Sequence, residues 1–154
     1  MNDASYRRIL VVVDLREDSL PIGRHAATLA RRLGAEVELL HVVELLPVEP
    51  MAETLIATVR IEDELLEQAR AGLAELAAQL GVAGAPCWVE SGNVKAEIVR
   101  VARKRRADLI VLGSRERHGM SILVNLTEDT VLHAAPCDVL AVRRVRRSGA
   151  TAES

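Results

Sequence analysis

Aromatic residues are almost absent from this 154-residue chain, which contains Tyr6, Trp88 and no phenylalanine. Proteins that bind single-stranded nucleic acid stack the bases on aromatic side chains, so the scarcity argues against that function. The formal net charge of −2 also offers no overall attraction to nucleic acid or to an anionic membrane. We therefore expect no membrane partner and disfavour a nucleic-acid partner.

Cysteine is also scarce. Cys87 and Cys137 are far apart in the sequence, form no CxxC pair and belong to no nearby cluster of His and Cys at metal-ligand spacing. We expect no metal site. Because both cysteines fall in or beside apolar strands, we expect them to be buried, inert thiols.

Long hydrophobic runs are missing as well. No apolar stretch approaches the roughly 20 residues that span a membrane, and the N-terminus leads into a strand without a signal-peptide pattern. These features predict a cytoplasmic protein. The length fits one domain with a full core, which we place at residues 1–147, followed by a disordered tail at 148–154.

Apolar runs and amphipathic segments alternate along the chain. Asn93 is expected to cap the helix that follows it, and Gly34 and Gly81 are expected to end helices. Such an order predicts an α/β fold with an open, doubly wound, five-stranded parallel sheet and helices on both faces. The expected strands are 9–13, 36–43, 86–90, 108–112 and 138–142, and the expected helices are 19–33, about 51 or 61 to 80, 94–105 and a segment ending near 134.

Two segments carry a family resemblance. Residues 107–114 (ADLIVLGS) with His118 and Gly119, and then 135–143 (APCDVLAVR), resemble the C-terminal signature of the universal stress protein family. Residues 8–14 (RILVVVD) and 39–43 (LLHVV) resemble its first two strands. The resemblance covers about residues 6–143 and implies a Rossmann-like sheet of strand order 3-2-1-4-5. It also implies a cytosolic stress-response protein that forms homodimers.

A ligand crevice is expected where the crossover direction changes, outside the carboxyl ends of the first and fourth strands. Asp14 closes the first strand and Gly113 closes the fourth. The resemblance implies that Asp14 and the backbone near Val42 face an adenine while a glycine loop holds phosphates. The candidate nucleotide-binding residues are thus Asp14, Val42, Gly113, Ser114, Asn125 and Thr127.

The phosphate loop departs from the family pattern of Gly-x2-Gly-x(8 or 9)-Gly-Ser/Thr. Glu116 occupies the second glycine position, and the last pair falls on 125–126 or, less favoured, on 126–127, where neither register supplies a glycine. A carboxylate about 5 Å from a phosphate costs roughly 3 kcal/mol, or about two decades of affinity. We therefore expect no bound cofactor, with ATP or AMP and Mg²⁺ as the alternative.

Three function classes remain. The favoured one is a dimeric stress-response regulator or interaction module with weak or absent ATP binding. The second is an ATP- or AMP-binding switch of the same fold. The third, a nucleotide hydrolase, is least favoured because Gly113 and Ser114 lack the G-x-S-x-G frame, and we expect no enzyme activity.

Two stretches of the sequence, one apolar and one basic, are relevant to which partners the protein binds. Residues 138–142 form an apolar run at a sheet edge without proline or inward charge, so we expect a homodimer paired through Val139, Leu140, Ala141 and Val142. The basic residues at 103–106 are typical of a solvated helix end.

Overall fold

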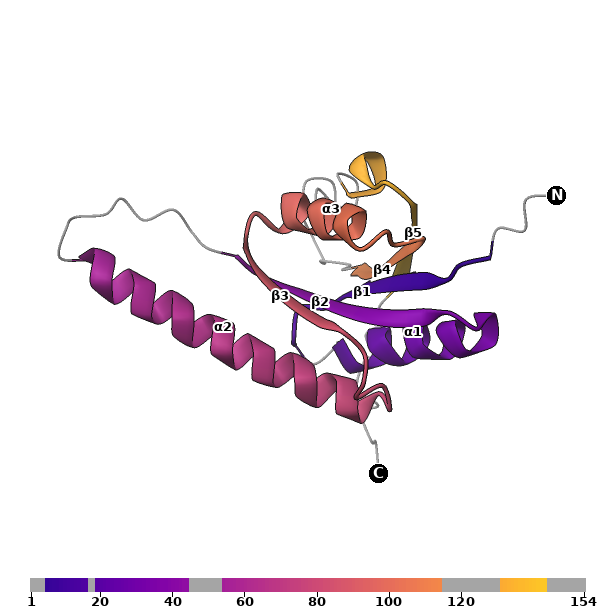
Figure 1. Ribbon diagram of the computed structural model, residues 1–154, viewed down its shortest axis with the longest axis horizontal. Coiled ribbons are helices and arrows are strands. Elements are labelled where there is room, and N and C mark those ends of the chain that lie inside the picture. The colour runs from indigo at the N-terminus through magenta and orange to yellow at the C-terminus, as the bar shows by residue number, and fades with distance from the viewer. Residues whose placement is uncertain (1–4, 17–18, 45–53, 115–130, 144–154) are drawn as a thin grey trace, which may run out of the picture.

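The computed structural model describes residues 5–16, 19–44, 54–114 and 131–143. Five parallel strands form one sheet in the order β3-β2-β1-β4-β5, as expected (Figure 1). Helices α1 and α2 cover one face, and α3 with a helical turn at 131–134 covers the other. The elements are β1 Arg8–Val12, α1 Ser19–Leu33, β2 Glu36–Glu44, α2 Thr54–Gln79, β3 Cys87–Gly92, α3 Val94–Lys104, β4 Leu109–Ser114 and β5 Asp138–Arg143.

The central strand β1 explains why the sheet is buried on both faces. Ile9 and Val11 pack with residues of α1 and α2, whereas Leu10 packs against the α3 layer. All three are at most 1% exposed. A continuous apolar run is what a parallel strand between two helical layers requires, and this is the pattern that the sequence showed.

Helix ends follow the expected signals. The side chain of Asn93 accepts a hydrogen bond from the Ala96 N–H at 3.1 Å and so caps α3. Gly34 and Gly81, which follow α1 and α2, have φ angles of 65° and 73°, in the left-handed region where glycine is favoured.

Replacing Asn93 with alanine should lower the free energy of unfolding by about 1 kcal/mol, because one orphan N–H of the first turn of α3 loses its acceptor. This corresponds to a fall in melting temperature of about 2–4 °C. Thermal unfolding followed by circular dichroism measures it. Asn93→Asp keeps the acceptor and should retain the wild-type melting temperature; equal losses in both variants would contradict the capping role.

Helix α2 begins at Thr54, between the two starts that the sequence left open. Its 26 residues span roughly 39 Å, and its N-terminal part extends beyond the sheet (Figure 1). Apolar residues at helical spacing are buried from Ala69 to Leu80, whereas Leu65, which continues the same stripe, is 40% exposed.

The prediction for Cys87 was also wrong in part. Cys87 is exposed and Cys137 is half-buried. Cys87 starts the edge strand β3, which has a neighbour on only one side. Partial desolvation nevertheless raises the pKa of both thiols, which favours the unreactive protonated form at neutral pH.

Candidate functional site

The crevice predicted from the sequence lies at the carboxyl ends of β1 and β4, which are neighbours in the sheet. Val11 of β1 is level with Val111 of β4, so two residues further along Val13 is level with Gly113. Asp14 therefore leaves β1 beside the end of β4. Because the chain turns to opposite helical layers after these two strands, this edge is open to a ligand in doubly wound sheets.

Asp14 organises the loop between β1 and α1. Its Oδ1 accepts hydrogen bonds from the Arg16 N–H at 3.0 Å and from the Ser19 hydroxyl at 3.1 Å. Leu15, which lies between Asp14 and Arg16 in the chain, adopts a left-handed φ of 58°. The carboxylate thus fixes a tight turn into the first residue of α1, which gives Asp14 a structural role in this chain.

Leu15 also brings α2 close to this turn. A Cβ placed on Gly72 of α2 would lie 3.4 Å from Leu15 Cδ1, an ordinary van der Waals distance, so the Leu15 side chain lies directly beside this part of α2. A shallow cavity of about 280 Å³ lies alongside, lined by Arg16, Glu75 and Gln79 among others. The sequence analysis did not identify this contact, because nothing in the spacing of residues 15 and 72 indicates it.

Val42 lies near the end of β2, on the same edge of the sheet. It is 8% exposed and packs within the α3-side core. The neighbouring His41 has its Nδ1 2.8 Å from the Val13 carbonyl oxygen. Since a carbonyl oxygen can only accept, Nδ1 carries the proton in this contact, which ties the ends of β1 and β2 together.

The remaining candidates fall into two groups. Gly113 and Ser114 close β4 and pair with Val142 and Arg143 of β5. Asn125 and Thr127 lie outside the described residues, as do Glu116 and Leu126. The fold therefore gathers Asp14, Val42, Gly113 and Ser114 at one edge of the sheet, and their role in binding a nucleotide stays a prediction.

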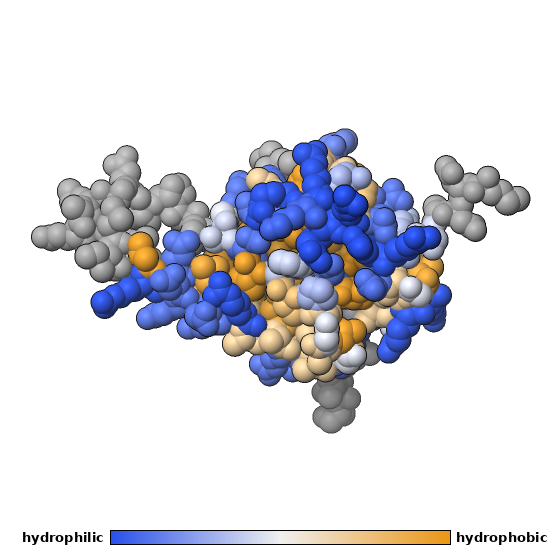
Figure 2. All heavy atoms as spheres, in the orientation of Figure 1, coloured by the Kyte–Doolittle hydropathy of each residue, from blue (hydrophilic) through white to orange (hydrophobic). Residues whose placement is uncertain are grey.

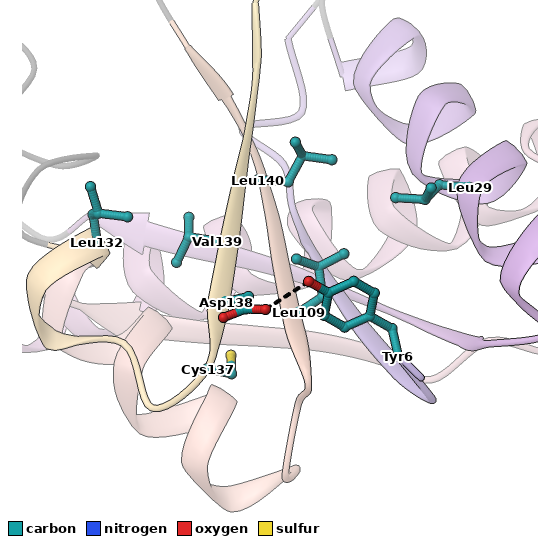
Figure 3. Close-up of a pocket in the computed structure, with 8 residues that line it drawn as sticks. All are labelled: Tyr6, Leu29, Leu109, Leu132, Cys137, Asp138, Val139 and Leu140. Atoms are coloured by element: carbon teal, nitrogen blue, oxygen red, sulfur yellow. Dashed lines mark hydrogen bonds between the residues drawn. The ribbon is translucent and has the colours of Figure 1, made fainter. Parts of the chain in front are cut away.

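A second hollow lies at the β5 edge, toward the opposite end of the strands. Its volume is about 510 Å³. Figure 3 shows Leu29 and Leu140 on one side of β5 and Leu132 and Val139 on the other. Leu132 is 58% exposed. Apolar side chains of both layers thus meet solvent along this strand.

Tyr6 and Asp138 close the end of that hollow. The Tyr6 hydroxyl donates to Asp138 Oδ2 at 2.6 Å (Figure 3). This hydrogen bond, together with burial and the charge of Asp138, raises the pKa of Tyr6. The contact joins the segment before β1 to the start of β5 and gives the Asp138 carboxylate a donor.

A buried polar cluster, which sequence reasoning missed, lies between β2, β3 and the end of α3. The Glu38 carboxylate accepts hydrogen bonds from Trp88 Nε1 at 2.8 Å and from Arg105 Nε and Nη2 at 2.8 and 3.0 Å. The Arg105 guanidinium also lies over the Trp88 ring, 4.5 Å from its centroid. Glu38 is only 7% exposed, although its alternation with Val37 and Leu39 is typical of a solvent-facing residue.

In the part of the chain that the structure describes, no group of three or more His, Cys, Asp or Glu side chains is placed so that it could hold a metal ion. Within the same residues, no helix is long and apolar enough to span a membrane.

Fold and crevice together define a doubly wound α/β protein of the Rossmann-like kind. Residues 5–143 match the Universal stress protein family, and the chain belongs to that family. It is 39% identical over 140 residues to universal stress protein A homolog 2 of Coxiella burnetii, covering 90% of this chain and 96% of the relative. It is 30% identical over 148 residues to universal stress protein MJ0531 of Methanocaldococcus jannaschii, covering 92% of this chain and 85% of that relative.

Solved structures agree on the fold. Universal stress protein UspA from Lactobacillus plantarum superposes with a TM-score of 0.77 at 24% identity, over 92% of this chain and 100% of that one. A universal stress protein in complex with cAMP superposes with a TM-score of 0.64 at 21% identity, over 92% and 99%.

Proposed function

We propose that this chain is a cytosolic stress-response regulator that acts as a homodimeric interaction module, binds ATP weakly or not at all, and catalyses no reaction. The observation that carries the proposal is the open β5 edge. β5 is the outermost strand, and its only strand neighbour in the described sheet is β4. An apolar strand in this position is a surface for pairing.

A second copy fits this edge on both faces. Leu140 and Val142 pack with the α1 and α2 layer, whereas Val139 packs with the α3 layer. An antiparallel β5 from a second copy would satisfy the exposed backbone groups and extend both apolar layers across a two-fold axis. The hollow beside Leu29 and Leu132 would then be filled by partner side chains.

Sedimentation velocity of the purified protein over a range of concentrations tests this proposal. A dimer at tens of micromolar supports it. A chain that sediments as a monomer throughout that range would overturn the interaction-module proposal, because the β5 edge would then have no partner copy.

The second part of the proposal, weak nucleotide binding, rests on residues around the crevice. One oxygen of Asp14 already accepts two hydrogen bonds from its own loop. In the sequence, Glu116 and Leu126 replace the glycine and the hydroxyl residue that would approach phosphates. A nucleotide switch remains the second candidate, since the carboxyl-end crevice itself is retained. A hydrolase is the least supported.

We expect millimolar ATP, AMP or cAMP, with or without Mg²⁺, to raise the melting temperature by less than about 2 °C, because ligand at or below its Kd stabilises by no more than about 0.4 kcal/mol. Differential scanning fluorimetry measures this shift. The double variant Glu116→Gly with Leu126→Ser should increase it if the loop is the defect. A shift of several degrees that saturates at micromolar ATP in the wild type would instead establish the nucleotide switch.

A further inference from the structure

Positive charge is concentrated at one end of the molecule, although the chain as a whole is slightly acidic. Parallel strands all begin at the same edge of the sheet, and the helices end there. Cations from the start of β1 and the end of α3 meet at this edge, opposite the crevice. We call Arg7, Arg8, Arg103, Lys104 and Arg106 the amino-edge basic patch, and all are exposed.

Two contacts bring the halves of the patch together. Arg8 Nη1 donates to the Arg105 carbonyl oxygen at 3.4 Å. The backbone N–H groups of Arg7 and Arg8 both donate to Asp108 Oδ2 at 2.9 Å. Figure 2 shows hydrophilic side chains gathered over α3 and at the end of the molecule where β1 begins.

The patch is not neutralised by its surroundings. Within the described part of the chain, Arg7, Arg103, Lys104 and Arg106 form no ion pair, whereas Arg70, Arg100 and Arg105 each have a carboxylate partner. Of the nearby acids, Glu38 is taken up by Arg105, and Asp108 holds the two backbone N–H groups. Two other exposed carboxylates lie at this edge: Glu36, level with Arg8 in the sheet, and Asp138 at the start of β5, which accepts a hydrogen bond from Tyr6.

Arg106 occupies the left-handed position that ends α3, where the backbone does not require an arginine. It follows α3 with a φ of 52°, where glycine is the favoured residue. Arg103 and Lys104 complement the helix dipole, but Arg7 precedes β1 and Arg8 begins it, so neither has a helix dipole to complement. The fold therefore carries more positive charge here than its helix end requires.

We propose that the amino-edge basic patch binds the phosphate backbone of double-stranded nucleic acid without sequence preference. Arginine guanidinium groups match phosphate oxygens in two-pronged hydrogen bonds, and backbone contacts need no aromatic platform. The net charge of −2 of the whole chain does not reveal this patch, because the fold brings its cations together from distant parts of the sequence. The proposal goes beyond the dimeric module proposed above and does not depend on it.

Single-stranded nucleic acid and a membrane surface fit the patch less well than a duplex. Tyr6 donates to Asp138 and Trp88 lies under Arg105, so neither ring is available to stack on bases. Membrane surfaces bind basic segments that also insert apolar side chains. Ile9 and Leu109, the large apolar residues next to the patch in sequence, are 0% and 4% exposed.

Fluorescence anisotropy with a labelled duplex DNA of about 20 base pairs tests the proposal, with phosphate-backbone binding recognised by its salt dependence. We expect the protein to bind the duplex at low salt. The logarithm of the association constant should fall with the logarithm of the salt concentration at a slope of about −3 to −4, which corresponds to about four phosphate contacts. Arg103→Glu with Lys104→Glu should weaken binding at least about tenfold. Arg60→Glu, at an exposed arginine in the N-terminal half of α2, is the control and should change affinity much less.

Arg106→Gly gives the sharpest separation of binding from folding. Glycine suits the backbone at this position, so the variant should melt at the wild-type temperature or above while its affinity for duplex falls severalfold. Absence of duplex binding by the wild type at low salt would overturn the proposal. So would equal losses in the patch and Arg60 variants, or patch-dependent binding to anionic vesicles with none to duplex.

Discussion

Replacing Glu38 with alanine is expected to lower the free energy of unfolding by roughly 3 kcal/mol. The carboxylate is buried and accepts three hydrogen bonds, from Trp88 on β3 and from Arg105 after α3. Its removal leaves a charged group and an indole N–H without their acceptor. Because the Arg105 side chain is 34% exposed and can turn toward water, the loss falls at the lower end of the range for broken buried ion pairs.

The same cluster makes stability depend on pH. Burial alone would raise the pKa of Glu38, but hydrogen bonds from Arg105 and Trp88, with the charges of Arg105 and Arg8, outweigh it and lower the pKa below the ordinary value of 4.5. A lowered folded-state pKa stabilises the protein above the unfolded-state pKa. The contribution is therefore full at neutral pH and is lost as pH falls below about 4.5 through the folded-state value.

Urea unfolding followed by Trp88 fluorescence measures both effects, since Trp88 is the sole tryptophan. Glu36→Ala is a matched control, because Glu36 is an exposed carboxylate on the same strand and its loss should cost less than about 0.5 kcal/mol. Glu38→Ala should also flatten the pH dependence of stability below about pH 4.5, where the wild type loses this contribution. Equal free energies of unfolding for the two variants would show that the buried cluster makes no net contribution to stability.

Much of the fold could be predicted from the sequence because burial on both faces leaves a strong pattern. Apolar runs, continuous or alternating, marked every strand within a residue or two, for example 36–43 against Glu36–Glu44. Glycine and asparagine marked the helix ends, where backbone conformation restricts the choice of residue. The family resemblance supplied the strand order that the structure confirms.

What the sequence could not predict depends on contacts between distant segments. Glu38 alternates with apolar residues like a surface residue, and only Arg105 and Trp88, brought by other elements, make its burial favourable. Leu65 continues the helical stripe of α2 yet is 40% exposed, which its spacing alone does not indicate. For the candidate crevice, the sequence placed Asp14 and Gly113 at one edge, yet the use of Asp14 Oδ1 by Arg16 and Ser19 needed coordinates.

Replacing Val142 with lysine is expected to raise the dissociation constant of the proposed homodimer by at least about a hundredfold, since an unpaired charge buried at the interface costs roughly 3 kcal/mol. Val142 is half-buried on the outermost strand, next to the α1-side core. In the isolated chain the lysine can reach solvent, so the variant should still fold. Leu140→Pro should give monomer too, because proline interrupts the pairing of the strand.

Val59→Lys is the control for this substitution. It makes the same chemical change on α2, where Val59 is already 50% exposed. Helix α2 packs beside β2 and β3, whereas β5 lies at the opposite edge of the sheet. Sedimentation equilibrium should find this control dimeric and Val142→Lys monomeric, with unchanged circular dichroism in both. Dimeric Val142→Lys with a native spectrum would place the interface elsewhere on the molecule.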